Sequence, residues 1–150
     1  MTPAHTAPCG IYCPDCILLK NQYSGLARRL RQELDDAGMR HYAAVQSSFG
    51  SQDLSEYPVF TKVLDTLCDM KCPHVCREGG GCGGMPCAIM LCCKAKGYAG
   101  CWECDELDAC TKFGFLEPRC GSMPKDNCRL IRENGLDGWE QLRKKFYVWL

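Results

Sequence analysis

Three features are scarce or missing in this 150-residue sequence: a net charge, a long apolar run and histidine. Lysine and arginine together number 18, as do aspartate and glutamate, so no charge excess indicates binding to nucleic acid or to an anionic membrane. No stretch approaches the roughly 18 consecutive apolar residues of a membrane-spanning helix. The first residues, MTPAHTAP, lack the basic start and apolar run of a secretion signal. We therefore expect a cytoplasmic protein whose partner is an unknown protein, not nucleic acid or a membrane.

The residue sets of common enzymes are also missing. Only His5, His41 and His74 are histidines, and neither a Ser/His/Asp arrangement nor a metal-hydrolase motif is visible. The glycine-rich stretch REGGGCGG at residues 77–84 is not followed by the Gly-Lys-Ser/Thr of a Walker A phosphate loop. The sequence therefore does not favour an enzyme.

Cysteine, by contrast, is abundant, with 15 residues in the chain. Nine of them lie between residues 72 and 110: Cys72, Cys76, Cys82, Cys87, Cys92, Cys93, Cys101, Cys104 and Cys110. A glycine-rich stretch of this kind cannot bury a useful apolar core, so a cross-link must hold it. An odd number of cysteines leaves one thiol over in any scheme made only of disulfides. Clustered and reduced cysteines indicate metal binding.

A separate group of thiols lies near the start, in the pattern Cys9-x3-Cys13-x2-Cys16. Three thiols so close together can bind one metal centre and leave its fourth position to a distant residue, so we expect them to meet a later cysteine in space. The same spacing holds a 4Fe–4S cluster in radical S-adenosylmethionine enzymes, but 150 residues cannot supply the large barrel of those enzymes. The alternative is a zinc knuckle beginning at Cys13.

Cys101-Trp-Glu-Cys104 is a second C-x2-C pattern. A thiol oxidoreductase would place such a pattern beside a βαβ unit, and that unit is absent from the sequence. Cys128 lies outside the clusters, and we expect it to be a small buried side chain.

Apolar residues at helical spacing predict a mainly α fold: a small helical domain over residues 1–150 with irregular Cys-rich metal-binding loops. We expect helices over 17–46 with a stop at Gly38, from about Pro58 to Met70, over 88–96, over 124–133 and over 136–147. Residues 47–57 are polar and predict a loop. A core stripe is predicted at Val59, Phe60, Val63, Leu64 and Leu67. A further helix is predicted to begin at the acidic residues Asp105, Glu106 and Asp108.

Four motifs in order resemble a known family. They are Cys9-Gly-x2-Cys13-x2-Cys16, Cys76-Arg-x-Gly-Gly-Gly, Cys87-x-Ile-x2-Cys92-Cys93-Lys-x-Lys-Gly and Gly-Cys101-Trp-x-Cys104-x5-Cys110. Over residues 9 to 112 this pattern is similar to the prokaryotic Cys-rich family called domain of unknown function 3795, which is presumed to bind metal. The resemblance implies this set of ligands: Cys9, Cys13, Cys16, Cys72, Cys76, Cys87, Cys92, Cys101, Cys104 and Cys110.

Zinc and iron–sulfur clusters both accept four thiolates, so spacing alone separates them poorly. Structural zinc sites often use a histidine as a ligand. His74, between Cys72 and Cys76, is the only histidine in this sequence that lies near the clustered cysteines. We expect one or two 4Fe–4S clusters in a redox, sensing or accessory role. The alternative is a protein-interaction module stabilised by Zn2+, and the second alternative is a thiol oxidoreductase.

Overall fold

The structure is a computed structural model that describes residues 5–72, 74–79 and 86–143. The chain divides into two compact units. We call residues 1–16 together with 73–150 the cysteine-rich unit, and residues 17–72 the helical unit. Helices dominate both, and within the described ranges the only pairing outside them is an isolated antiparallel bridge between Thr6 and Tyr12. The predicted mainly α fold is confirmed.

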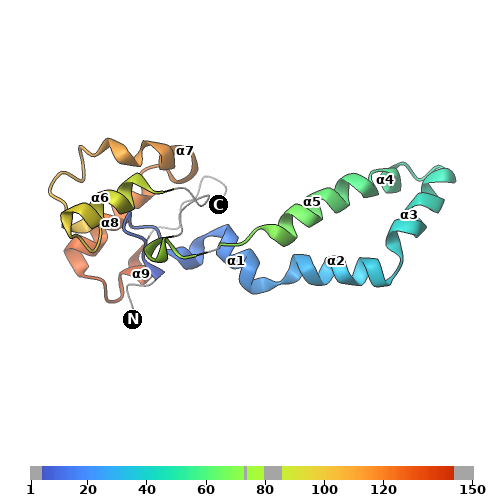
Figure 1. Ribbon diagram of the computed structural model, residues 1–150, viewed down its shortest axis with the longest axis horizontal. Helices are drawn as coiled ribbons and strands as arrows, with labels where there is room; N and C mark the ends of the chain where they lie inside the picture. The colour runs from blue at the N-terminus through green and yellow to red at the C-terminus, as the bar shows by residue number, and fades with distance from the viewer. Residues whose placement is uncertain (1–4, 73, 80–85, 144–150) are drawn as a thin grey trace. The chain divides into compact units, whose positions relative to one another are not determined.

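Two antiparallel helices form the body of the helical unit. Its elements are α1 (Ile17–Ser24), α2 (Leu26–Asp36), α3 (Met39–Ser48), α4 (Gln52–Ser55) and α5 (Tyr57–Asp69). Helices α2 and α5 run side by side, with α3 and α4 joining them at one end (Figure 1). The Arg31 guanidinium on α2 donates to the Asp65 carboxylate on α5, 2.7 Å away.

Glycine sets two helix boundaries in this unit. Gly38 separates α2 from α3 in a left-handed conformation with φ 65°, which confirms the predicted stop. Gly25, with φ 60°, breaks the predicted long helix between α1 and α2, and the sequence analysis missed this break. The predicted loop over 47–57 is confirmed only at residues 49–51 and 56, because α3 continues to Ser48, α4 spans Gln52–Ser55 and α5 begins at Tyr57. Polar composition fits an exposed helix as well as a loop.

The predicted core stripe on α5 is mostly wrong. Pro58 does lie in the first turn, and Leu64 is buried. The other members of the stripe are exposed, and they are Val59, Phe60, Val63 and Leu67. The buried face of α5 instead consists of Tyr57, Thr61 and Leu64, which also follow helical spacing.

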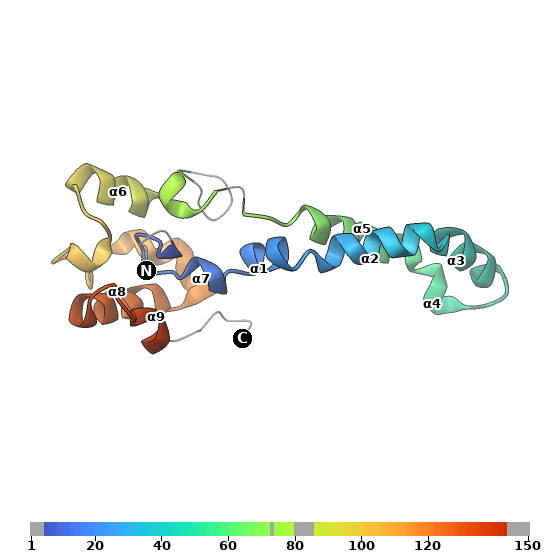
Figure 2. The same cartoon turned by 90° about the horizontal axis from the view of Figure 1, so that it is seen from below.

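Short helices separated by loops build the cysteine-rich unit (Figure 2). The α-helices are α6 (Ala88–Lys96), α7 (Glu117–Cys120), α8 (Met123–Asn134) and α9 (Trp139–Leu142). The 3-10 helices are η2 (Cys13–Asp15), η3 (Cys76–Glu78), η4 (Cys101–Glu103) and η5 (Thr111–Leu116). Helices α6 and α8 confirm two predictions, and Gly97 ends α6 in the left-handed region.

One helix prediction in this unit is wrong, and another is confirmed only in part. Residues 105–109 form turns, and Glu106 and Asp108 pair there with Lys96 and Arg129 from other elements and not with a helix N-terminus. The last predicted helix begins at Trp139 and ends at Leu142, since Arg143 is extended. The remainder of that prediction, residues 144–147, lies outside the described residues.

The N-terminal segment runs into the core of the cysteine-rich unit. The Cys101 amide donates to the Pro8 carbonyl (2.7 Å), the Asn127 amide to the Gly10 carbonyl (2.9 Å) and the Trp139 indole to the Thr6 hydroxyl (3.2 Å). The core itself contains Ala7, Cys9, Ile11, Ile89, Cys93, Cys101, Trp102, Leu107, Phe113, Leu116, Cys120, Met123, Cys128, Ile131 and Trp139. A third of these side chains are thiols. In the described part of the chain, no helix has the length and apolar character needed to cross a membrane.

Candidate metal centre

Both C-x2-C patterns adopt the same local backbone, one turn of 3-10 helix. In η2 the Cys16 amide donates to the Cys13 carbonyl at 2.9 Å. In η4 the Cys104 amide donates to the Cys101 carbonyl at 3.1 Å. Pro14 lies in the first turn of η2, where its missing N–H costs no hydrogen bond. The two patterns therefore present their thiols from equivalent turns.

One group of thiols brings the start of the chain to its middle. We call Cys9, Cys13, Cys76 and Cys87 the first thiol group. The thiols of Cys13 and Cys76 are in hydrogen-bonding contact, and Cys9 lies close enough to Cys76 and Cys87 to interact electrostatically. Cys9 and Cys13 are buried. The prediction that the N-terminal thiols meet later ones is confirmed.

A second group of thiols surrounds one small cavity. We call Cys92, Cys93, Cys101, Cys104 and Cys110 the second thiol group, and all five line this cavity of about 20 Å³. The sulfur atoms of Cys93 and Cys101 are 3.6 Å apart. At the rim, the Lys96 ammonium lies 4.0 Å from the Cys104 sulfur and 3.0 Å from the Glu106 carboxylate.

Cys128 on α8 links the two groups. It is fully buried and close enough to interact electrostatically with Cys9, Cys93 and Cys101. Burial raises the pKa of Cys128 to about 12, so this thiol stays neutral at physiological pH. Its predicted burial is confirmed, but it lies among the clustered thiols and not apart from them.

Contact between thiols moves their pKa values in opposite directions. The hydrogen bond from Cys101 lowers the pKa of Cys93, and the same contact, together with burial, raises the pKa of Cys101. In the first thiol group, the hydrogen bond with Cys13 and then burial raise the pKa of Cys76. Metal ligation needs thiolates, so binding at either group would release protons.

Arg77 supplies half-buried positive charge near both groups. Its guanidinium donates to the carbonyls of Thr6 (2.7 Å) and Ala99 (2.9 Å) and lies 5.5 Å from the ring centre of Trp102. Electrostatic interactions connect it to thiols of the first group and to Cys93 of the second. Burial lowers the pKa of Arg77, while these thiols act in the opposite direction. A cation here offsets the negative charge of thiolates.

Two predicted ligands, Cys16 and Cys72, lie outside these groups. Cys16, half-buried, follows η2 in the cysteine-rich unit. Cys72 belongs to the helical unit, where its amide donates to the Gln22 side chain at 3.1 Å. His74 is exposed. Cys82 lies outside the described residues. Among those that are described, no three His, Cys, Asp or Glu side chains are already arranged around one point as ligands, so the contacts of these groups are pairwise.

Cys93 is not among the ligands predicted from the sequence. Cys92 of the adjacent pair was predicted as the ligand, but Cys93 is the buried one and the one in contact with Cys101. Successive residues on an α-helix point about 100° apart, so the two thiols of α6 cannot face η4 equally. The helical spacing of Ile89 and Cys93, both buried on α6, was the signal that could have identified it.

A family model described as "Protein of unknown function (DUF3795)" matches residues 5–115 of the chain. No curated protein and no solved structure matches the chain significantly. The match covers most of the sequence and includes both thiol groups, so the chain belongs to the DUF3795 family.

Proposed function

We propose that this member of the DUF3795 family is a protein-interaction module whose cysteine-rich unit is stabilised by zinc bound to thiolates. The observation that carries the proposal is the 3.6 Å separation of the Cys93 and Cys101 sulfur atoms. Two thiolates bound to one tetrahedral zinc at about 2.3 Å each lie roughly 3.8 Å apart. A pair of thiols at this separation suits a shared single ion.

The surroundings of the thiols also suit a metal–thiolate centre. Four thiolates around a divalent cation carry excess negative charge, which is costly to bury without a counter-charge. Arg77 and Lys96 provide positive charge beside the thiols. Zinc supplies cross-links without redox chemistry, and such cross-links would stabilise a unit whose core is rich in sulfur and whose loops are rich in glycine.

Each thiol group would supply ligands for one centre. Cys9, Cys13, Cys76 and Cys87 would serve the first, with Cys16 as a further donor. The second would draw on Cys92, Cys93, Cys101, Cys104 and Cys110. Cys128 is assigned to neither centre, because it is fully buried and does not line the cavity of the second thiol group. The balanced charge of the chain favours a protein partner over nucleic acid.

A 4Fe–4S cluster in a redox, sensing or accessory role is the second candidate. It is favoured by the five thiols of the second group, which face one cavity from α6, η4 and the start of η5. A cubane cluster takes one protein thiolate on each of its four irons, so it needs thiolates distributed around a larger volume than one ion does.

Anaerobic purification followed by metal and sulfide analysis tests the proposal. We expect about two zinc ions per chain, no acid-labile sulfide and no visible absorption, since each structural zinc takes four ligands. Iron and sulfide in equal amounts, with broad visible absorption, would favour the second candidate. A metal-free protein in which Cys93 and Cys101 form a disulfide would contradict both and favour the thiol oxidoreductase.

A further inference from the structure

We propose that two arginines of the C-terminal segment, Arg132 and Arg143, are positioning residues that each hold one C-x2-C turn in place for metal binding. The inference rests on the proposed function and extends it to residues without a thiol. Both arginines follow residue 115, the last residue that matches the family model. Each contacts the backbone or a side chain within its turn.

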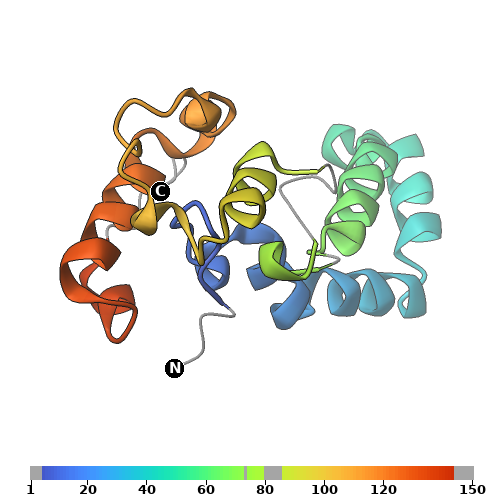
Figure 3. The ribbon, with the colours of Figure 1, turned by 60° about the vertical axis from the view of Figure 1, so that its left-hand side comes forward.

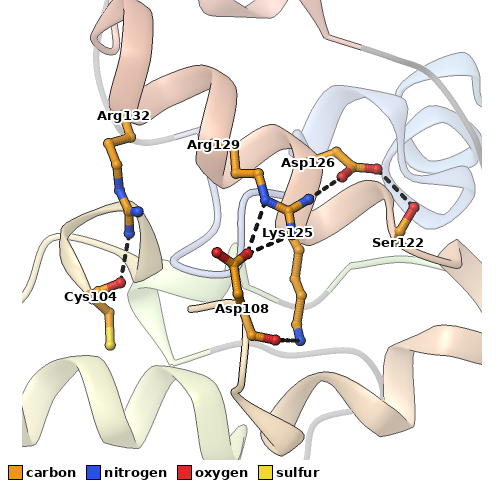
Figure 4. Close-up of polar contacts among 7 residues, drawn as sticks. All are labelled: Cys104, Asp108, Ser122, Lys125, Asp126, Arg129 and Arg132. Carbon is orange, nitrogen blue, oxygen red and sulfur yellow. Dashed lines mark hydrogen bonds and ion pairs between the residues drawn. The ribbon is translucent and has the colours of Figure 1, made fainter. Parts of the chain in front are cut away.

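Arg132 holds the turn of the second thiol group. From α8, its Nε donates to the Trp102 carbonyl at 2.9 Å and its Nη2 to the Cys104 carbonyl at 2.6 Å. Figure 4 shows this guanidinium directed at Cys104. Carbonyls at the end of a helix lack donors within it, so a charged donor there stabilises the turn. The rigid guanidinium fork fixes both carbonyls at once.

The same face of α8 holds the rest of the loop up to Cys110. Lys125 donates to the Asp108 carbonyl at 3.0 Å, and Arg129 contacts the Asp108 carboxylate through two nitrogens, at 3.0 and 2.6 Å (Figure 4). Lys125, Arg129 and Arg132 are spaced at i, i+4 and i+7, so they share one helix face. Helix α8 packs against η4 (Figure 3), and Arg132 contacts η4 from this helix. The loop that carries Cys101, Cys104 and Cys110 is therefore held at several points.

Arg143 has the corresponding place at the N-terminal turn. It forms a two-pronged ion pair with Asp15, which lies between Cys13 and Cys16, with contacts of 2.6 and 2.9 Å. The two side chains are only 10% and 12% exposed, so solvent screens the pair weakly. The guanidinium also lies 4.2 Å from the ring centre of Tyr12. Each C-x2-C turn is thus held by an arginine that carries no metal-binding thiol itself.

Residues that orient metal ligands without binding the metal commonly change metal affinity by about 10- to 100-fold when they are replaced. We therefore predict separate effects from Arg132→Met and Arg143→Met. In zinc-loaded protein challenged with a chelator, the first should weaken zinc at the second thiol group by roughly tenfold or more and spare the first group. Arg143→Met should weaken zinc binding at the first thiol group and spare the second. Mass spectrometry of alkylated cysteines then shows which group has lost zinc. Alkylation of Cys104 and Cys110 reports loss from the second thiol group, and alkylation of Cys9 and Cys13 reports loss from the first.

Arg119→Met is the matched control. Arg119, on α7, is exposed, and the described part of the chain gives it no hydrogen bond or ion pair, so its replacement removes the same charge without touching a turn. Zinc retention should equal that of the unchanged protein. Arg132→Lys should recover part of the affinity, because a lysine can donate to one of the two carbonyls. This recovery would separate positioning from general loss of packing.

Equal zinc loss from both groups in each variant, or no loss in either, would overturn the inference. If the unchanged protein holds no metal, the proposed function fails. The role of the arginines in positioning the turns can still be tested, by comparing alkylation rates of the cysteines in metal-free protein. Arg132→Met should then speed alkylation of Cys104 but not of Cys16, and unchanged rates would contradict it. If the methionine variants do not fold, the lysine variants are compared in the same way.

Discussion

At the scale of single residues, neighbouring cysteines have different environments. Cys93 is 4% exposed and contacts Cys101, whereas Cys92 beside it is half-buried. Cys104 sits at the rim of the cavity near Lys96, while Cys128 lies sealed in the core. A fully buried thiol packs as a small apolar group, whereas a thiol at the rim of a cavity is accessible to a metal ion.

This difference predicts opposite results from two cysteine substitutions. Cys104→Ser replaces a soft ligand with a hydroxyl that binds zinc or iron poorly, so metal content should fall by up to one whole centre. Cys128→Ala should keep the full metal content and lower the free energy of unfolding by roughly 1 kcal/mol. Metal analysis and denaturant unfolding of the two variants measure these outcomes. Equal metal loss from both would show that Cys128 is part of a centre.

Gly10 should tolerate no side chain. Its φ is 85°, and a Cβ there would lie 2.5 Å from the Pro124 carbonyl oxygen and 2.9 Å from the Cys128 sulfur. Gly10→Ala therefore combines left-handed strain with a clash against backbone, for a loss of roughly 2–5 kcal/mol in unfolding free energy. Gly97→Ala, with φ 69° and no atom within 4 Å of its Cβ, should lose only the strain, about 1–2 kcal/mol. Similar losses in the two variants, measured by denaturant unfolding, would argue against close packing of α8 on Gly10.

At the scale of elements, α5 carries two apolar stripes of which one is buried. Leu64 is 2% exposed and Val63 is 55% exposed, although the two are adjacent. Leu64→Ala should cost roughly 2–4 kcal/mol in unfolding free energy, because it leaves a cavity. Val63→Ala should change it by less than about 1 kcal/mol. Denaturant midpoints of the two variants test this, and a larger effect at Val63 would mean that its side chain is covered in solution.

The two stripes also explain which parts of the fold the sequence could predict. The boundaries of α6 and α8 were predicted to within about one residue. In both helices the helical spacing of apolar residues ends where a glycine follows, so the two signals mark the same end. Spacing could not choose the buried face of α5, since Tyr57, Thr61 and Leu64 fit the period as well as Val59, Val63 and Leu67 do. It also could not reveal the break at Gly25, because the leucine period continues across it.

The candidate site was predictable in outline for a similar reason. Cysteine spacing indicates which thiols are neighbours along the chain, and the structure brings Cys13 to Cys76 as expected. Contacts from distant elements have no local pattern. Arg132 and Arg143 lie 28 residues from Cys104 and 128 residues from Asp15, respectively, so the sequence alone gave no indication of these pairs.

At the scale of the whole molecule, the two units differ in what stabilises them. The core of the cysteine-rich unit includes five thiols, and its first thiol group joins Cys9 and Cys13 to Cys76 and Cys87 from a distant part of the sequence. The helical unit contains Cys68 and Cys72 but neither thiol group, and its helices α2 and α5 are joined by the Arg31–Asp65 ion pair and by packing. Thiolate–metal bonds would therefore contribute to one unit and not to the other.

Metal removal should consequently loosen the units in a fixed order. A structural zinc can supply folding free energy on the order of 10 kcal/mol, so a chelator with a reductant should raise amide hydrogen exchange first in η2, η4 and the loop up to Cys110. Protection in α2 and α5 should stay unchanged at the same chelator concentration, since no member of either thiol group lies on them. Hydrogen exchange followed by mass spectrometry reads both units in one sample, and re-addition of zinc should restore the lost protection. Simultaneous loss from both units would show that they unfold as one, and unchanged exchange in the cysteine-rich unit would mean that metal does not stabilise it.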